Sequence, residues 1–147
     1  MQQMIFVNLP VADVAAATAF YEAVGFRKDA RFCDGSGSCM VLSDTISVMV
    51  LSRERFADFT QKQIIDPKRQ VQTLLCISRE SAQAVDAIVD AAVAAGGAAD
   101  PGPKQDMGGF MYGRSFEDLD GHVWEPMWMD VAAMEKMMAD GGQMEPA

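Results

Sequence analysis

Glu125 is the residue of this chain whose type and surroundings most strongly indicate chemistry, because it stands in the apolar run Val123–Met129. Asp120-Gly121, just before this run, is typical of a turn, and the residues after it favour a strand. A carboxylate there must be exposed, paired or placed in a pocket, because burying an unpaired charge is costly. In an apolar pocket its pKa would rise and make it a better general base near neutral pH. We therefore predict a catalytic Glu125, with a structural carboxylate paired with Arg114 as the alternative.

Three polar side chains are further candidates for contact with a small ligand. Asn8 and Tyr112 can supply hydrogen-bonding groups, and the alternatives are strand-end hydrogen bonding for Asn8 and an amphipathic surface position for Tyr112. Arg114 can bind an anionic group with two of its nitrogens, or it can pair with Asp118 or Glu117.

The composition indicates a globular protein that does not bind nucleic acid. The chain has 147 residues, 50% of them apolar and 22% charged, which suits one domain or two small modules. Its formal net charge is −9, whereas nucleic acids and anionic membranes attract basic surfaces. No apolar run reaches the roughly 18 residues of a membrane-spanning helix, and the N-terminus lacks the features of a signal peptide. The odd number of cysteines, three, then indicates reduced thiols, so we expect a cytoplasmic protein.

The hydrophobic pattern predicts one structural unit written twice, as a strand, a helix closed by glycine, and three more strands. The first copy is predicted as a strand at 3–11, a helix at 14–24 and strands at 26–32, 39–42 and 46–51. The second is predicted as a strand at 70–77, a helix at 81–95, a short strand near 98–99 and strands at 110–116 and 122–129. A helix and loop connect the copies, and a Met-rich helix follows at 131–139.

Equivalent positions in the two copies support the repeat. Val11 corresponds to Ile77, and Gly25 corresponds to Gly96. The order βαβββ, written twice, predicts an α+β protein. We divide the chain into a first module at 1–52, a connector at 53–69, a second module at 70–130 and a tail at 131–147.

Motifs in both modules resemble those of a known protein family. They are Leu9-Pro10-Val11-Ala12-Asp13, Phe20-Tyr21 with Gly25-Phe26, the run 109–116, and Asp118-Leu119-Asp120-Gly121-His122-Val123-Trp124-Glu125. Together they resemble the vicinal oxygen chelate superfamily, which includes glyoxalase I, extradiol dioxygenases and the fosfomycin- and bleomycin-resistance proteins. The runs 8–11 and 111–116 resemble a lactoylglutathione lyase-like branch. The resemblance implies one domain over 1–130, built as a curved mixed sheet with a concave cup, helices on its convex face, and a homodimer.

The resemblance also implies where a metal would bind. Members take one ligand from the first strand and one from the fourth strand of each module, often His, Gln or Glu. The family spacing puts these positions at Phe6, Met49, Gln72 and Glu125, and strand alternation independently places them, with Asn8, on the cup side. Phenylalanine cannot ligate, and a thioether is a soft ligand. We therefore expect no cofactor. The alternative is that Gln72 and Glu125 bind Ni, Zn, Mn or Fe, and that a second chain or the substrate supplies the remaining ligands.

The resemblance implies that a small organic molecule binds in the cup. As a glyoxalase-like lyase or isomerase, or a dioxygenase-related enzyme, the protein would use Glu125 as its base. As a non-catalytic protein resembling bleomycin-resistance proteins, it would sequester a cationic drug without metal, which the charge of −9 favours. A regulatory domain without a small ligand is a third reading. The predicted ligand-binding residues are Phe6, Asn8, Met49, Gln72, Tyr112 and Arg114.

Overall fold

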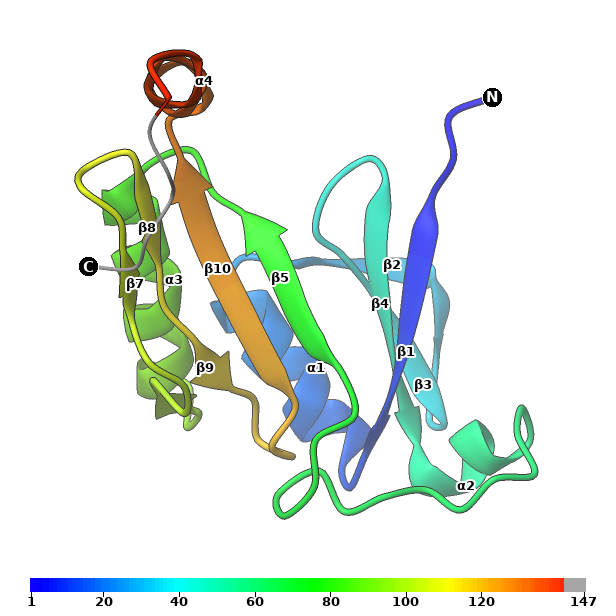
Figure 1. The fold of residues 1–147 in the computed structure, drawn as a ribbon. Helices are drawn as coiled ribbons and strands as arrows, with labels where there is room; N and C mark the ends of the chain where they lie inside the picture. Colours follow the sequence, from blue (N-terminus) through cyan, green and yellow to red (C-terminus); the bar gives the residue numbers. More distant parts are fainter. Residues whose placement is uncertain (142–147) are drawn as a thin grey trace. The chain divides into compact units, whose positions relative to one another are not determined.

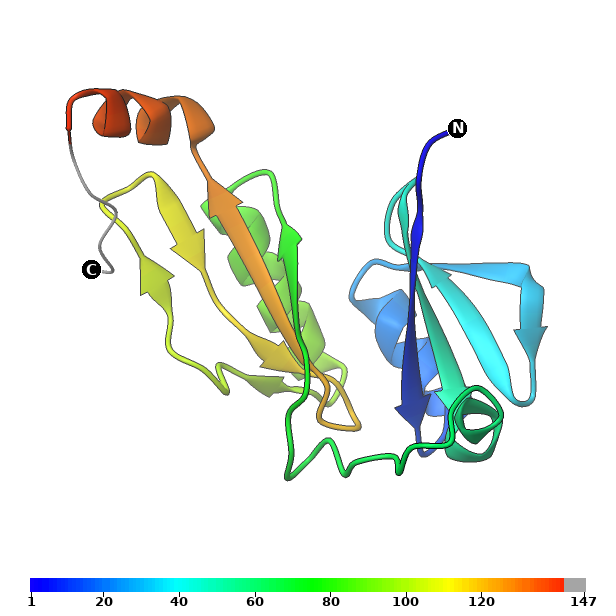
Figure 2. The same cartoon turned by 45° about the vertical axis from the view of Figure 1, so that its right-hand side comes forward.

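The computed structural model describes residues 1–141 and has an α+β fold made of two compact units (Figures 1 and 2). Unit 1 comprises Met1–Val71 together with the short segment Asp118–His122. Unit 2 comprises Gln72–Glu117 and the chain from Val123 onward. The predicted α+β class is confirmed. The predicted connector, 53–69, belongs to unit 1, and the end of the predicted tail, 142–147, lies outside the described residues.

Unit 1 contains a four-stranded sheet in the order β1-β4-β3-β2. β1 runs parallel to β4, and the other neighbours are antiparallel. The strands agree with the predicted ones apart from shifted ends; they are β1 (Ile5–Val11), β2 (Arg27–Asp34), β3 (Gly37–Val41) and β4 (Ile46–Ser52). A short helix, α2 (Arg53–Ala57), follows β4.

One face of this sheet is covered by α1 (Val14–Ala23) (Figure 1). The helix begins where the Asp13 carboxylate accepts a hydrogen bond from the Ala16 backbone N–H at 3.0 Å, as an N-cap residue does. It ends before Gly25, whose φ of +105° closes the helix at little steric cost. Phe20 and Tyr21 lie on its buried side. Packing of this apolar face against the sheet builds the core of unit 1.

Unit 2 repeats the arrangement around a central strand, β10 (Val123–Met129). β10 runs parallel to β5 (Leu74–Ser78) and antiparallel to β8 (Met111–Gly113) and β9 (Phe116–Glu117). The outer pieces are β6 (Ala98–Ala99) and β7 (Gln105–Asp106). The helix α3 (Ala82–Ala94) covers one face, and α4 (Val131–Ala139) forms the predicted Met-rich helix.

The strand predicted at 110–116 is divided into β8 and β9, and the cause is Pro126 on the neighbouring β10. Arg114 donates its backbone N–H to the Pro126 carbonyl oxygen at 3.1 Å. Proline has no N–H with which to return a hydrogen bond to Arg114, so the ladder is interrupted there. The next residue pairs with another segment, because the Asp100 N–H donates to the Ser115 carbonyl oxygen at 2.8 Å.

The strand predicted at 70–77 is also shorter than expected, because β5 begins only at Leu74. Its partner β10 cannot extend the pairing in that direction. The residues before Val123 form a turn in which the Asp118 carboxylate accepts the backbone N–H groups of Asp120 and His122, each at 2.9 Å. Gln72 therefore lies in a bend, outside any strand.

The segment Asp118–His122 is fixed to unit 1 by side-chain hydrogen bonds. The Tyr21 hydroxyl donates to the Asp118 carboxylate at 2.5 Å, and both residues are buried. The Ala12 N–H donates to Asp120 at 2.8 Å, and His122 Nε2 lies 2.8 Å from the Pro10 carbonyl oxygen. His122 is thus half-buried, and its ring is held by this contact.

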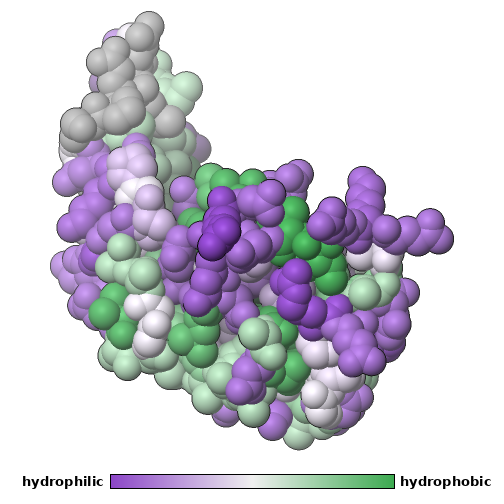
Figure 3. Space-filling model, turned by 90° about the horizontal axis from the view of Figure 1, so that it is seen from below, coloured by the Kyte–Doolittle hydropathy of each residue, from purple (hydrophilic) through white to green (hydrophobic). Residues whose placement is uncertain are grey.

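Each unit has its own apolar core. Tyr21 and Phe20 lie edge to face in unit 1, and Phe116 and Trp124 are stacked in unit 2. Some apolar residues remain exposed, and Figure 3 shows a mainly hydrophilic face with hydrophobic patches between the polar side chains. No helix within residues 1–141 is long and apolar enough to span a membrane.

Candidate functional site

The side chains of β10 alternate between two faces of the unit 2 sheet. Trp124 and Pro126 are buried on the side that packs against α3. Val123, Glu125 and Met127 point to the other side and are each half-buried. We call this side, together with Leu74 and Cys76 of β5, the open face of unit 2.

Glu125 lies among apolar neighbours on this open face. Val123 and Met127 flank it on β10, and 54% of the Leu74 side chain on the adjacent strand is exposed. Within residues 1–141, the Glu125 carboxylate has no hydrogen bond or ion pair, so the alternative pairing with Arg114 does not occur. An unpaired carboxylate on an apolar surface gains free energy from a partner that supplies a donor or a positive charge.

Cys76 is a polar neighbour of Glu125 that the sequence analysis did not single out. The two residues are directly paired between parallel strands, which places their side chains on the same face. Desolvation of the thiol and the nearby Glu125 carboxylate both raise the pKa of Cys76 above its usual value, although the residue is exposed. The alternation of side chains along β5 places Cys76 on the open face. The register with β10 shows that its neighbour there is Glu125.

The corresponding open face of unit 1 carries Phe6, Asn8 and Met49. β1 and β4 are in register at Asn8 and Met49, and 51% of Phe6 is exposed at the outer end of β1. The same register continues from Met49 to Cys39 on β3 and to Asp29 on β2. A row of amide, thioether, thiol and carboxylate groups therefore crosses all four strands. The predicted common face for Phe6, Asn8 and Met49 agrees with this register.

Asp29 and Cys39 are buried members of this row that the sequence analysis missed. Arg31 donates to Asp29 from Nε at 3.0 Å and from a terminal nitrogen at 2.8 Å, and these hydrogen bonds lower the pKa of Asp29 to about 2. Burial, assisted by the Asp29 charge, raises the pKa of the Cys39 thiol. The Asp-x-Arg spacing of Asp29 and Arg31 on one strand was the available signal, because alternate residues share a face.

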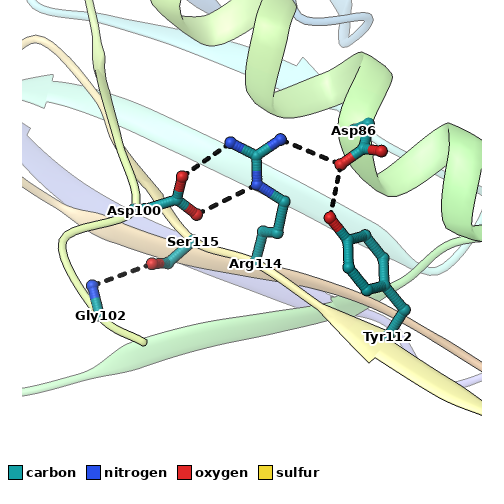
Figure 4. A network of polar contacts seen from close by, with 6 residues as sticks. All are labelled: Asp86, Asp100, Gly102, Tyr112, Arg114 and Ser115. Atoms are coloured by element: carbon teal, nitrogen blue, oxygen red, sulfur yellow. Dashed lines mark hydrogen bonds and ion pairs between the residues drawn. The ribbon is translucent and has the colours of Figure 1, made fainter. Parts of the chain in front are cut away.

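Tyr112 and Arg114 lie on the opposite side of the unit 2 sheet from Glu125, which corrects the expectation that they share the ligand face. The Tyr112 hydroxyl donates to Asp86 of α3 at 2.8 Å, and Arg114 donates to the same oxygen at 3.0 Å (Figure 4). Arg114 also donates hydrogen bonds to Asp100 from two nitrogens, at 2.7 and 3.1 Å. Neither Asp118 nor Glu117, the expected partners, takes part. Pairing with Trp128 puts Tyr112 on the helix side.

The sequence of residues 3–125 matches the family model of the glyoxalase/bleomycin resistance protein/dioxygenase superfamily. The chain belongs to this superfamily. No curated protein matches the sequence. The predicted superfamily is therefore confirmed, and the lactoylglutathione lyase-like branch stays a prediction.

Several solved structures share the fold. A glyoxalase/bleomycin resistance protein/dioxygenase family enzyme from Burkholderia phytofirmans is 20% identical, with a TM-score of 0.69 over 87% of this chain and 99% of that one. A glyoxalase-related enzyme from Fulvimarina pelagi is 20% identical, with a TM-score of 0.70 over 87% and 88%. A hypothetical protein from S. aureus is 24% identical, with a TM-score of 0.71 over 87% and 94%. At these identities the likeness shows the fold and does not assign an activity.

The four metal positions implied by the superfamily do not fit a divalent ion in this chain. Phe6 has no donor atom, and Met49 offers a soft thioether that suits neither Ni, Zn, Mn nor Fe in an oxygen and nitrogen site. Gln72 lies in an exposed bend, and only Glu125 is both a hard ligand and held by a strand. Within residues 1–141, no group of three or more His, Cys, Asp or Glu side chains is suited to hold a metal ion.

Proposed function

We propose that this superfamily member binds a small organic molecule on the open face of unit 2 and holds it through Glu125. The observation that carries the proposal is the half-buried Glu125 carboxylate, which has apolar neighbours and no partner within residues 1–141. A ligand with an apolar body covers Val123, Leu74 and Met127, and its donor group binds the carboxylate. Such complementarity combines apolar burial with a charge-assisted hydrogen bond.

The preferred ligand carries a positive charge. The net charge of −9 attracts cations over a longer range than a single contact does. A cation also compensates the Glu125 charge directly, whereas a neutral alcohol of the same shape donates only a weaker hydrogen bond without a compensating charge. Methionine side chains such as Met127 adapt to ligands of different shape. We therefore propose a sequestering role for cationic aromatic molecules that needs no divalent metal.

The experiment uses the fluorescence of Trp124 and Trp128 on β10. The protein is titrated with 2-phenylethylamine, with its neutral analogue 2-phenylethanol, and with bleomycin as a large cationic drug, in the presence of EDTA. We expect the amine to bind about tenfold more tightly than the alcohol, because a hydrogen bond to a charged group contributes about 1.5 kcal/mol or more. Glu125→Gln should abolish this preference.

Glu80→Gln is the matched control, because it removes the same charge from an exposed residue just after β5. It should leave the preference unchanged. Equal binding of amine and alcohol, or an equal effect of both substitutions, would overturn the proposal. Binding that requires added Ni²⁺ or Zn²⁺ would overturn its metal-independent form.

Proton transfer is a second candidate function, favoured by the same unpaired carboxylate. A carboxylate without a hydrogen-bond partner can act as a base and remove a proton from a carbon beside a carbonyl group. Returning the proton to the adjacent carbon completes an isomerisation, which needs no oxidant. The test is the formation of S-lactoylglutathione from methylglyoxal and glutathione. Product formation that Glu125→Gln abolishes and Glu80→Gln retains would establish this activity.

A further inference from the structure

A cavity of about 410 Å³ that is open to solvent lies in unit 1 between α1 and the hairpin of β2 and β3. It is on the helix side of the sheet, because Lys28 is paired with the fully buried Met40 and shares its face. The open face with Asn8 and Met49 is on the other side. The volume falls within the range of about 300–1,000 Å³ typical of small-molecule sites. This cavity is therefore separate from the site proposed above.

The floor of the cavity is polar and ordered. Thr18 and Ser38 are both buried there, and their hydroxyl oxygens lie 2.9 Å apart. Thr18 also donates to the Val14 carbonyl oxygen at 2.7 Å. The Cys33 thiol is directed to the Asp29 carbonyl oxygen at 3.0 Å, so it is not free for a ligand. The short side chains of Ala15 and Ala19 complete the helix wall.

Two opposite charges line the cavity without meeting each other. Glu22 of α1 and Lys28 of β2 both contribute to its wall. Within residues 1–141, neither side chain has a hydrogen bond or an ion pair, and they do not form a salt bridge together. The third charged group, Asp34, is already engaged, because one of its oxygens accepts from the Ser36 and Gly37 N–H groups and the Ser36 hydroxyl.

The chain path puts the two free charges at the same end of the cavity. α1 ends at Ala23, the chain turns at Gly25, and β2 starts at Arg27 and returns along the helix. Glu22 and Lys28 therefore stand beside the turn. Thr18 and Ala19 lie about one helical turn, roughly 5 Å, further along the helix axis. A ligand with its charged head at the turn would extend its body over these residues.

We propose that this cavity binds a zwitterionic α-amino acid with an aliphatic side chain. The ligand carboxylate binds the Lys28 ammonium group, and the ligand ammonium group binds the Glu22 carboxylate. Both protein charges gain a partner that the fold does not provide. The aliphatic side chain lies against Ala19 and Ala15, where it is removed from water. The site is independent of Glu125 and of the open face of unit 2.

The test is calorimetric titration of the full-length protein with leucine and with its two halves. 4-Methylpentanoate lacks the ammonium group, and isopentylamine lacks the carboxylate. We expect leucine to bind about tenfold more tightly than either analogue, because only leucine makes charge-assisted contacts with both Glu22 and Lys28. Glu22→Gln and Lys28→Met should each remove most of this advantage.

Three further variants keep the result interpretable. Ala19→Phe fills the cavity from an exposed helix position and should abolish leucine binding without affecting the fold, which circular dichroism verifies. Glu54→Gln and Lys62→Met change exposed charges elsewhere in unit 1 and should have no effect. The proposal is overturned if leucine binds no better than 4-methylpentanoate, or if Ala19→Phe binds leucine as the unmodified protein does.

Discussion

Glu125 and Arg114 stand close in the fold of unit 2 and have opposite roles because they point to opposite faces of one sheet. Glu125 is left without a partner, whereas Arg114 is held by two carboxylates, and its side chain is only 12% exposed. The hydrogen bonds that Arg114 donates to Asp100 and Asp86 raise the pKa of its guanidinium group, so its charge is permanent. Because neighbouring positions of a sheet alternate between its two faces, Glu125 is available to a ligand, whereas Arg114 stabilises the fold.

Arg114→Met should lower the free energy of unfolding by about 2 kcal/mol, because it leaves Asp86 and Asp100 as neighbouring uncompensated carboxylates. Denaturant unfolding measures the change. Arg55→Met is the control, because Arg55 pairs with Asp58 at the surface, where ion pairs contribute little. Equal losses for the two variants would show that the Arg114 network does not stabilise the fold.

The same network predicts that the free energy of unfolding decreases at acid pH. Hydrogen bonds from Tyr112 and Arg114 lower the pKa of Asp86, and those from Arg114 lower the pKa of Asp100. A lowered pKa means that the stabilisation is present above the usual aspartate value of about 3.9 and is lost as the pH falls below it. As the pH falls, the free energy of unfolding should decrease less steeply in Arg114→Met than in the unmodified protein.

At the scale of elements, the turn before β10 decides where that strand begins and so where Glu125 lies. Asp118 accepts two backbone N–H groups of the turn, and Gly121 adopts a φ of +100°. A side chain on Gly121 would lie 2.7 Å from the Pro67 carbonyl oxygen and 2.9 Å from the Lys68 backbone. Both the backbone conformation and the lack of space therefore require glycine.

Gly121→Ala should destabilise the protein by about 2–4 kcal/mol, since it combines positive-φ strain with a backbone clash. Gly25→Ala has positive φ but open space around it, and should cost about 1 kcal/mol. Gly35→Ala has neither problem and should be nearly neutral. Thermal unfolding of the three variants gives the order. A Gly121→Ala protein as stable as Gly35→Ala would contradict the placement of this turn.

At the scale of the whole molecule, the chain passes from one unit to the other more than once. Asp118–His122 belongs to unit 1, although β9 before it and β10 after it belong to unit 2. The buried hydrogen bond from Tyr21 to Asp118 holds this segment against α1. Folding of β10 is thereby linked to folding of unit 1 through a covalently continuous and hydrogen-bonded segment.

Tyr21→Phe should lower the free energy of unfolding by about 2 kcal/mol, because it leaves a buried carboxylate with one fewer donor. Hydrogen exchange at the Ala12 amide, which binds Asp120, should also become faster. Tyr112→Phe is the matched control, because this tyrosine donates to an aspartate that is 49% exposed. It should cost clearly less. An equal or larger loss for Tyr112→Phe would refute the importance of the Tyr21 contact.

The sequence by itself determined the α+β class, the twofold βαβββ pattern, the face of the unit 1 sheet on which Phe6, Asn8 and Met49 lie, and the face of the unit 2 sheet on which Glu125 lies. These follow from local rules, since hydrophobic period and turn residues act within a few residues. Only the tertiary structure decided that Gln72 lies outside β5, that Pro126 divides the strand opposite it, and that Arg114 meets Asp86 and Asp100. Register and partner choice depend on residues far apart in the chain, so no local pattern carries them.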